Sequence, residues 1–324
     1  MVNEFLNNRH EKFNVSKDMV FNLVKDSTKL NPTKRNKIIE GYDNEVYSIE
    51  TKEGKHFILR INRKTEAGFE NEAWAMEQCK KSGVPLPKIF LLDTIQIDDK
   101  KVEVMLQNKL AGLSLEKLQT KLSKQELEQI LFQAGDVLSK IHSVKADGFY
   151  HRHREGNWDF PSWDKFMQST INGRSSEREF IFNAGFNDRE FNFMINMLKK
   201  YKEEFSCDQP VLCHGDYSPE HIFVDNKLKI SGIIDFGMIE GNHPIHDFAY
   251  LSFQNPQLDL KPIMEGYKNK SHFEDRFNER LNLHKLLLQM GHLAHHSKIK
   301  DYEAVKSLTL TLRKTLNFLK TIKK

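Results

Sequence analysis

Two short motifs constrain the fold of this chain more than any other feature. One is His214-Gly215-Asp216 with His221 five residues beyond the aspartate, and the other is Asp235-Phe236-Gly237 after an apolar run. An aspartate beside a glycine is usually a turn residue. Asp216, beside Gly215, and Asp235, two residues before Gly237, lie in one stretch of short apolar runs and instead indicate loops that a rigid scaffold holds in place. Loops of that kind often carry chemistry.

The first third of the chain predicts a sheet with one helix. Phe69, Ala73 and Met76 recur at the spacing of a helix, which Gly83 and the prolines that follow it should end. The residues at 51–54 form a plausible hairpin turn. Runs rich in β-formers occupy residues 37–40, 46–49, 56–61, 89–92 and 102–106.

After Gly112 the pattern changes to long helices. One apolar stripe continues through residues 127–141, and similar patterns recur at 281–293 and 305–319. We therefore predict an α+β protein with two parts. Residues 1–108 should form an antiparallel sheet with one main helix, and residues 109–324 a larger, mainly helical part.

Composition excludes several classes of protein. With 324 residues and 39% apolar content, the chain can build a large core without stabilising cross-links such as disulfides. We expect its three cysteines, Cys79, Cys207 and Cys213, to be packing residues, which suits a cytoplasmic location. No secretion signal or membrane-length apolar stretch is expected, and a net charge of +4 without a dense basic block argues against nucleic acid as a partner.

The two motifs match the needs of phosphoryl transfer. That reaction requires a carboxylate at the acceptor hydroxyl and two further ligands that hold Mg²⁺ on the phosphates of a nucleotide triphosphate. Asp216, His221 and Asp235 have the order and spacing of these groups in the catalytic loop and the Asp-Phe-Gly segment of protein kinases. His221 alone would more often be a hydrogen-bonded core or surface histidine.

Over nearly its whole length the chain resembles the aminoglycoside phosphotransferase superfamily. The positions that match the family's motif, with similar spacing, are Asp216, His221, Asp235 and Asp247. The resemblance implies a bilobal protein-kinase-like fold, a catalytic loop at residues 212–224, Mg²⁺, and ATP or GTP as co-substrate. It also implies that Asp216 is the catalytic base, that His221 and Asp235 (in 235–237) bind the metal, and that Asp247 steadies the loop.

Two positions depart from the family pattern. His221 stands where most members have a metal-binding asparagine, a form similar to that of macrolide phosphotransferases. Imidazole suits Mg²⁺ less well than an amide oxygen does, because Mg²⁺ prefers hard oxygen ligands. His243 stands where the family has the first aspartate of its Asp-Pro segment.

A kinase also needs a cation for the phosphates and a carboxylate that holds this cation. Arg60 lies where a protein kinase has the lysine of its third strand, and Glu72 lies at the edge of the buried stripe of its predicted helix. A guanidinium binds phosphate and carboxylate through two parallel hydrogen bonds. We therefore expect an Arg60–Glu72 pair, although a solvated Arg and a solvated Glu would be the usual interpretation of each alone.

The nucleotide-binding segments are identified mainly by resemblance. The turn Gly41-Tyr42-Asp43-Asn44 is similar to the superfamily's phosphate-covering loop, in which Asn44 and backbone N–H groups would contact phosphate. Asn108 and Leu110 would present backbone groups to the purine from the segment that resembles the family hinge. Phe223 would form an apolar floor beneath the base, or it is a core aromatic.

The acceptor remains open between a small antibiotic, such as an aminoglycoside or a macrolide, and a metabolite alcohol. Basic residues outnumber acidic ones after Asn242, which disfavours a polycationic acceptor. Aromatic residues between Gly148 and Trp163 favour a ring-bearing acceptor or simply pack in the core.

Three other functions compete with this interpretation of the sequence. The alternative to an enzyme is a degenerate nucleotide-binding regulatory module. A protein kinase is disfavoured because no Ala-Pro-Glu follows Asp235. A zinc site at His292, His295 and His296 is disfavoured because no fourth ligand is evident.

Overall fold

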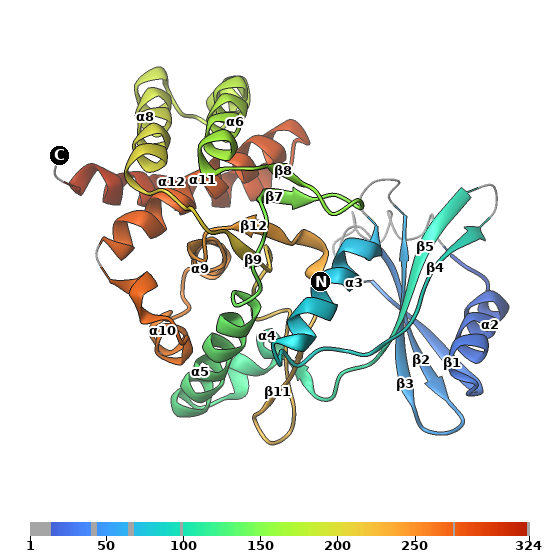
Figure 1. Ribbon diagram of the computed structural model, residues 1–324. Coiled ribbons are helices and arrows are strands. Elements are labelled where there is room, and N and C mark those ends of the chain that lie inside the picture. Colours follow the sequence, from blue (N-terminus) through green and yellow to red (C-terminus); the bar gives the residue numbers. More distant parts are fainter. Residues whose placement is uncertain (1–13, 40–43, 64–67, 98–99, 275, 323–324) are drawn as a thin grey trace. The chain divides into compact units, whose positions relative to one another are not determined.

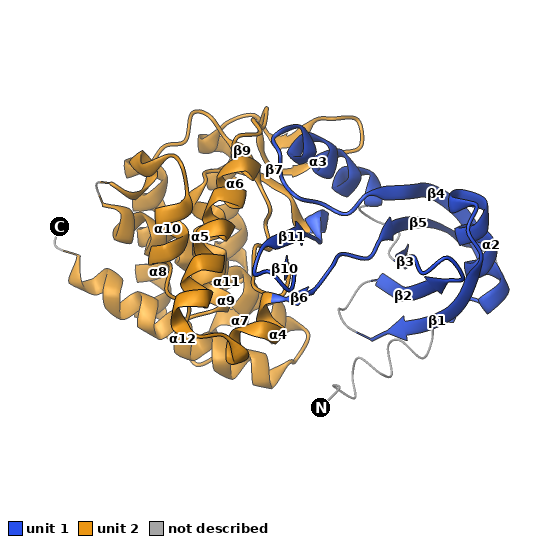
Figure 2. Cartoon of the chain, turned by 90° about the horizontal axis from the view of Figure 1, so that it is seen from below, with its two compact units in different colours: residues 1–114, 223–237 blue, residues 115–222, 238–324 orange. Residues whose placement is uncertain are grey.

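The computed structural model describes residues 14–39, 44–63, 68–97, 100–274 and 276–322 (Figure 1). The chain divides into two compact units (Figure 2). Unit 1 comprises residues 1–114 and 223–237, and unit 2 comprises residues 115–222 and 238–324. The division expected after residue 108 stays a prediction. Within the segment 223–237, Phe223 and Val224 pair with Ser114 and Leu113 in a small sheet of unit 1.

Unit 1 is built on a five-stranded sheet of order β1-β2-β3-β5-β4 in which neighbouring strands are antiparallel. Gly54, at φ +72°, lies in the predicted hairpin turn between the second and third strands. The strands are β1 (Pro32–Ile38), β2 (Asn44–Thr51), β3 (His56–Asn62), β4 (Ile89–Ile97) and β5 (Lys100–Asn108).

Two helices cover opposite faces of this sheet (Figure 1). Helix α2 (Lys17–Thr28) begins at Ser16, whose side chain accepts a hydrogen bond from the backbone of Met19, and its valines pack on one face. Helix α3 (Phe69–Lys81) is held on the other face, where the backbone N–H of Phe69 donates to Glu103 on β5. The alternation of buried residues along the strands produces these two distinct faces.

A second, three-stranded sheet of unit 1 joins distant parts of the chain. Its order is β11-β10-β6, from β6 (Leu113–Ser114), β10 (Ile222–Val224) and β11 (Ile230–Ile233). Gly112 leads into it at φ +85°, and a Cβ atom there would lie 1.8 Å from the carbonyl oxygen of Val224. Only glycine therefore fits at this approach.

Unit 2 is mainly helical around a second core. Its four-stranded sheet has the order β8-β7-β12-β9, from β7 (Phe149–Arg152), β8 (Trp158–Phe160), β9 (Val211–Cys213) and β12 (Glu240–Asn242). Its α-helices are α4 (Leu115–Leu118), α5 (Lys124–Ile141), α6 (Trp163–Ser176), α7 (Arg178–Asn183), α8 (Asp188–Glu204), α9 (Ile245–Gln254), α10 (Lys261–Gly266), α11 (Phe277–Lys298) and α12 (Tyr302–Thr321).

Short 3-10 turns complete the described elements: η1 (Gln119–Lys121), η2 (Phe236–Met238) and η3 (Lys270–Phe273). Helix α5 begins with a capping box between Ser123 and Glu126, and it buries the apolar stripe expected from the sequence. The core of unit 2 is formed largely by α6, α8, α11 and α12. Helices α11 and α12 match the two C-terminal patterns that predicted them.

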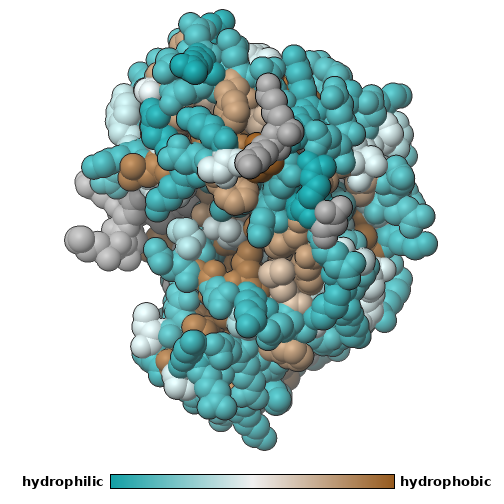
Figure 3. All heavy atoms as spheres, turned by 90° about the vertical axis from the view of Figure 1, so that its left-hand side faces the viewer, coloured by the Kyte–Doolittle hydropathy of each residue, from teal (hydrophilic) through white to brown (hydrophobic). Residues whose placement is uncertain are grey.

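The side that carries α8, α10 and α12 is mostly hydrophilic, with apolar side chains showing in its recesses (Figure 3). The described helices include none with the combined length and apolar character needed to cross a bilayer. Cys79, Cys207 and Cys213 are buried, as expected for packing residues, and they form no disulfide within the described part of the chain.

Candidate active site

Unit 1 brings Arg60, Glu72 and Asp235 into direct contact. Arg60 extends from β3, and its Nη1 binds Oε1 of Glu72 on α3 while its Nη2 lies 3.0 Å from Oδ1 of Asp235. Arg60 is 8% exposed and Glu72 2% exposed, so this pair lies out of bulk water. The guanidinium of Arg60 thus connects the segment after β11 to the five-stranded sheet.

The electrostatics of this cluster favour a charged Arg60. Burial disfavours the guanidinium charge, yet the carboxylates of Glu72 and Asp235 raise the pKa of Arg60 above its usual value. Burial also raises the pKa of Glu72, against the opposing effect of Arg60. We take both groups as ionised, because an arginine keeps its proton in proteins and a buried guanidinium needs a carboxylate partner.

Asp235 has the properties of a ligand to a hard cation. Its backbone has φ +67°, a conformation that few non-glycine residues adopt and that clusters at functional sites. Its side chain is 44% exposed, in contrast to the buried Arg60 and Glu72. An arginine fixes this carboxylate on one side, while part of its surface stays accessible. Such a carboxylate suits Mg²⁺ binding.

The residues expected to contact the base also belong to unit 1. The N–H of Asn108 donates to Lys88 O at 3.1 Å, and its side chain accepts from the N–H of Lys88, so a base contact of Asn108 rests on its carbonyl. The side chain of Leu110 packs against Gly232, and Phe223 is half-buried on β10.

Asn44 is half-buried at the start of β2, opposite Asn62. Gly41, Tyr42 and Asp43, the rest of the predicted phosphate-covering turn, lie outside the described residues.

The part of the predicted catalytic loop that carries Asp216 and His221 belongs to unit 2 and follows β9. Gly215 has φ +80°, and a Cβ atom there would lie 1.8 Å from the carbonyl oxygen of Met238, so the His-Gly-Asp turn requires glycine. The N–H of Asp216 donates to Nδ1 of His214 at 3.2 Å. The side chain of Asp216 keeps 27% of its surface exposed, as an acceptor-facing base requires.

His221 is held in one tautomer by the same loop. Its Nδ1 lies 2.8 Å from the carbonyl oxygen of Asp216, to which only an N–H can donate. The lone pair of the neutral ring is then on Nε2, the arrangement by which a histidine binds metal. His221 therefore offers a nitrogen ligand, and it is less suited to Mg²⁺ than the carboxylate of Asp235 is.

Asp247, on α9, anchors the turn that carries Asp216. One carboxylate oxygen accepts from the N–H of His214 at 2.8 Å and the other from the N–H of Gly215 at 2.9 Å. Nε2 of His142 also lies 2.8 Å from Asp247, and Nδ1 of His142 lies 3.0 Å from the hydroxyl of Tyr267. Although burial acts in the opposite direction, the hydrogen bond and charge of His142 lower the pKa of Asp247 to about 2.

His142, Cys213 and Asp247 also place three possible metal-ligand atoms close together. Hydrogen bonds account for the carboxylate, as described above, and Cys213 Sγ lies 3.6 Å from the carbonyl oxygen of His243. Burial raises the pKa of the Cys213 thiol well above its usual range, which keeps it protonated. The group therefore supports the loop and needs no metal.

Near the end of α11, His292, His295 and His296 do not form a cluster of metal ligands with other described residues. His292 packs against Phe253, with ring centroids 5.2 Å apart, and burial lowers its pKa to about 4. His296 lies 3.1 Å from Asp301, and His295 is exposed. Among the residues that the structure describes, no group of metal ligands includes any of the three.

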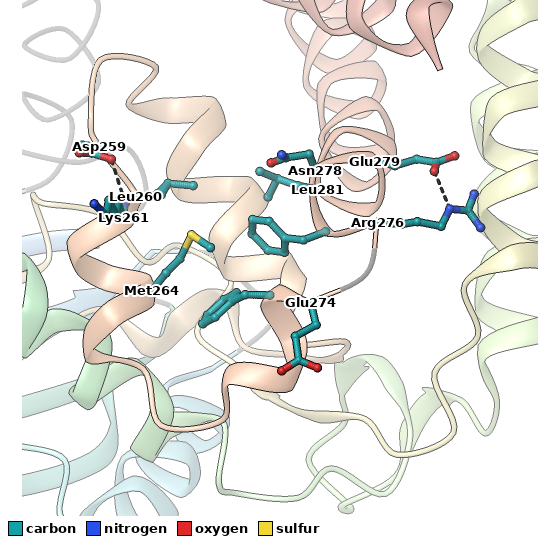
Figure 4. Close-up of a pocket in the computed structure, with 11 residues that line it drawn as sticks. Asp259, Leu260, Lys261, Met264, Glu274, Arg276, Asn278, Glu279 and Leu281 are labelled. Atoms are coloured by element: carbon teal, nitrogen blue, oxygen red, sulfur yellow. Dashed lines mark hydrogen bonds and ion pairs between the residues drawn. The ribbon is translucent and has the colours of Figure 1, made fainter. Parts of the chain in front are cut away.

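A cavity of about 510 Å³ lies in unit 2 between α10 and the start of α11 (Figure 4). Charged side chains of its wall are engaged with neighbours, Asp259 with the backbone of Lys261 and Arg276 with Glu279. No residue of the predicted catalytic loop lines it. This cavity is therefore distinct from the acceptor site predicted at Asp216.

The structure adds one residue that the sequence did not indicate. The hydroxyl of Tyr250, on α9, accepts from Nε2 of Gln254 at 3.3 Å and lies near enough to Asp216 for that carboxylate to affect its pKa. Burial, followed by the charge of Asp216, raises the pKa of Tyr250 above its usual value, so the phenol stays protonated and can donate to the carboxylate. A lone tyrosine three residues after Asp247 gives no sequence signal of this contact.

Comparison with known proteins decides the family. The model of the phosphotransferase enzyme family matches residues 35–277, which is most of the chain. The chain belongs to this family. No curated protein matches this phosphotransferase in sequence.

Solved structures share the fold of the phosphotransferase at low sequence identity. The aminoglycoside phosphotransferase APH(4)-Ia is 16% identical over 93% of this chain and 99% of its own, with a TM-score of 0.71. The GDP and kanamycin complex of APH(2″)-IIia is 15% identical over 93% and 99%, with a TM-score of 0.65. Macrolide 2′-phosphotransferase type I is 15% identical over 92% and 98%, with a TM-score of 0.60.

These matches confirm three expectations for the phosphotransferase. The resemblance to the aminoglycoside phosphotransferase superfamily is confirmed, as is the protein-kinase-like α+β fold with an antiparallel sheet and a helical part. The enzyme class, a small-molecule kinase that acts on an alcohol group, is also confirmed. The roles of individual residues remain predictions.

Proposed function

We propose that this phosphotransferase moves the γ-phosphoryl group of ATP or GTP to a hydroxyl group of a small molecule. The observation that carries the proposal is the buried Arg60–Glu72 pair with Asp235 on the same guanidinium. A fixed cation beside an accessible carboxylate is what a metal-bound triphosphate requires. A related structure, of an APH(4)-Ia mutant, contains ADP and hygromycin B, which supports a nucleotide and a hydroxylated acceptor.

On the nucleotide side, residues 1–108 supply most of the binding groups in this proposal. Arg60 binds the phosphates, and Glu72 holds its guanidinium in one orientation. Asn44 contacts phosphate from the start of β2, whereas Asn108, Leu110 and Phe223 surround the base.

On the acceptor side, residues 109–324 supply the base. Asp216 accepts the proton of the acceptor hydroxyl as that oxygen attacks the γ-phosphorus, and the nucleoside diphosphate leaves. The turn that carries Asp216 cannot swing freely, because Asp247 binds the N–H groups of His214 and Gly215. The protonated hydroxyl of Tyr250 is available to donate a hydrogen bond to the carboxylate itself. Positioning of this kind is the main contribution of a protein to phosphoryl transfer.

Asp235 and His221 would hold Mg²⁺. The donor set fits, since Asp235 offers an accessible carboxylate and the hydrogen bond at Nδ1 directs the lone pair of His221 to Nε2. When bound, the ion neutralises charge on the phosphates. Asp235 is the stronger ligand for a hard cation, and His221 the weaker.

For the acceptor, we propose an antibiotic of the aminoglycoside or macrolide kind, or a metabolite alcohol. Related structures are named for aminoglycosides and a macrolide, which supports the first two. The basic character of the chain after Asn242 favours acceptors that are not polycations. A cytoplasmic location is proposed with it, because the three cysteines form no disulfide among the residues that the structure describes.

A thermal-shift screen followed by a turnover assay tests the proposal. With Mg²⁺ present, ATP or GTP at 100 times its Kd should stabilise the protein by about 2.7 kcal/mol, and a panel of antibiotics and alcohols should then include one that is phosphorylated. Failure of both nucleotides to raise the melting temperature would contradict the proposal. Binding without turnover on any acceptor would favour the regulatory module.

His221 can be tested as a metal ligand by two substitutions. We expect His221→Ala to raise the Mg²⁺ concentration needed for half-maximal activity by roughly 10–100-fold, and His221→Asn to retain activity because an amide oxygen suits Mg²⁺. Mg²⁺ titrations of steady-state turnover measure both effects. The exposed His295 provides a control, since His295→Ala should not change the titration. An unchanged Mg²⁺ dependence in His221→Ala would exclude the ligand role.

A further inference from the structure

Glu45, the second residue of β2, is a carboxylate buried on the side of the sheet that faces α2. It is 1% exposed. Residues two apart on a strand share a face, so Glu45 lies on the face of Tyr47, which belongs to the core cluster that includes α2. Asn44 and Arg60 lie on the opposite face, because Arg60 is paired with Val46. A buried carboxylate is costly unless hydrogen bonds and a cation compensate its charge.

Three segments of unit 1 supply the groups that compensate this charge. Oε1 of Glu45 accepts from the backbone N–H of Val15 at 3.0 Å and from the hydroxyl of Tyr47. Oε2 accepts from Nε of Arg63 at 2.9 Å and from Nη2 of the same guanidinium. Burial raises the pKa of Glu45, yet these hydrogen bonds hold it below its usual value. The ionised carboxylate therefore joins the chain before α2 to β2 and to the residue after β3.

Val15 uses both of its backbone groups at this point. While its N–H donates to Glu45, its carbonyl oxygen accepts from Nη1 of Arg35 on β1. Cζ of Arg35 also lies 4.6 Å from the ring centroid of Tyr47. The chain before α2 is thus fastened to β1 and β2 beside the carboxylate.

The strand register places these contacts at the phosphate end of the proposed nucleotide site. Glu45 lies directly after Asn44, which is proposed to contact phosphate, and directly before the strand pair that contains Arg60. The base is proposed at the other end of β3, beside Asn108. Among the described residues, the ladder between β2 and β3 stops at Asn44, and Arg63 is the next residue after β3. The Glu45–Arg63 ion pair ties the two strands together where their backbone pairing stops.

We propose that Glu45 is a positioning residue for the triphosphate. Its side chain points away from the face that carries Arg60, so it acts through the backbone of β2 and β3. By holding the ends of these strands it fixes Asn44 relative to Arg60, and Val15 brings the chain before α2 into the same support. Positioning is the main contribution of a protein to phosphoryl transfer. Loss of the carboxylate should therefore weaken the binding of the phosphates and spare that of the base.

This inference rests on the proposed function, and its test separates the two. Isothermal titration with Mg²⁺ would measure the Kd of the preferred triphosphate, ATP or GTP, and the Kd of its nucleoside, which carries no phosphate. Glu45→Gln should raise the Kd of the triphosphate roughly 10-fold, because an amide has no charge to pair with Arg63 and turns a donor toward other donors. The Kd of the nucleoside should stay within about twofold, since the base end of the sheet is distant from the change.

Tyr47→Phe is a milder second variant. It removes only the hydroxyl that donates to Glu45, and phenylalanine fills the same space in the core. We expect it to raise the Kd of the triphosphate about threefold and to leave that of the nucleoside unchanged, because one hydrogen bond is lost while the ion pair stays. If Glu45→Gln does not fold, Tyr47→Phe decides the question.

The chain offers a matched control at the other end of β2. The carboxylate of Glu53, in the turn between β2 and β3, accepts from the backbone N–H of Asn31 at 3.1 Å and from its side chain at 2.8 Å. It thus fastens the chain after α2 to the same hairpin, away from Asn44. Glu53→Gln should keep both Kd values of the wild type.

Two results would overturn the role of Glu45 while wild-type binding and turnover still support the phosphotransferase. One is an unchanged Kd of the triphosphate in the folded variants of Glu45 and Tyr47. The other is an equal weakening of triphosphate and nucleoside, which would show a general loss of structure. Absence of nucleotide binding by the wild type would contradict the proposed function and this inference together.

Discussion

Asp216→Asn is expected to lower kcat by roughly 10²–10⁴-fold, because an amide cannot accept the proton of the acceptor hydroxyl. The Kd for Mg-nucleotide should stay within about threefold of the wild-type value, since Arg60, proposed to bind the phosphates, and Asp235, proposed to bind Mg²⁺, are unchanged. Steady-state kinetics and isothermal titration on the same preparations measure the two quantities. A large loss in kcat with intact binding is the signature of a lost general base.

The exposed Asp208 provides the control for this substitution, because it precedes β9 without belonging to the predicted loop. Asp208→Asn should leave both kcat and Kd unchanged. If Asp216→Asn retained more than about a tenth of the wild-type kcat, Asp216 would not be the base, whatever its position in the motif.

Asp247→Asn is expected to destabilise the protein by about 2–5 kcal/mol. The fully buried carboxylate accepts hydrogen bonds from the N–H groups of His214 and Gly215, and an amide would turn an NH₂ group toward one of these donors. Breaking a buried charge network in this way leaves donors unpaired. Urea denaturation at neutral pH measures the change in the free energy of unfolding.

The destabilisation should depend on pH in a defined window. The pKa of Asp247 is lowered from 3.8 to about 2 in the folded protein, so its ionisation contributes stability that is complete above about pH 4 and is lost as pH falls through 2. The difference between wild type and Asp247→Asn should therefore be constant above pH 4 and shrink by about 2 kcal/mol toward pH 2.

Asp136 supplies the control for Asp247. It is half-buried on α5 and paired with Lys140, so Asp136→Asn should cost less than about 1 kcal/mol. Equal effects of the two substitutions would show that Asp247 is an ordinary ion-paired carboxylate.

Most of the elements that position the site were predictable, because their apolar periodicity is strong. Helices α3, α5, α11 and α12 and the strands β2 to β5 lie where the spacing of apolar residues places them. The Arg60–Glu72 contact also follows from sequence, since the buried edge of α3 leaves a carboxylate in need of a partner.

What the sequence could not provide depends on contacts between distant segments. The pairing of β10 with β6 moves residues 223–237 into unit 1, and two- and three-residue strands give almost no periodic signal. The role proposed for Tyr250 comes only from the nearness of its hydroxyl to Asp216, a residue distant from it in the sequence. Helix α2 was not predicted, although Ser16 caps it by accepting a backbone hydrogen bond, as serine commonly does at the start of a helix.

The central claim is that Asp216 and Asp235 act on the same phosphoryl group. A crystal structure with Mg²⁺, a non-hydrolysable ATP analogue and a phosphorylatable acceptor tests it most directly. We expect Asp235 to coordinate the ion on the phosphates at about 2.0–2.1 Å, and the carboxylate of Asp216 to lie about 2.6–3.2 Å from the acceptor hydroxyl. A complex in which the acceptor hydroxyl and the γ-phosphorus lie beyond the reach of Asp216 would contradict the claim.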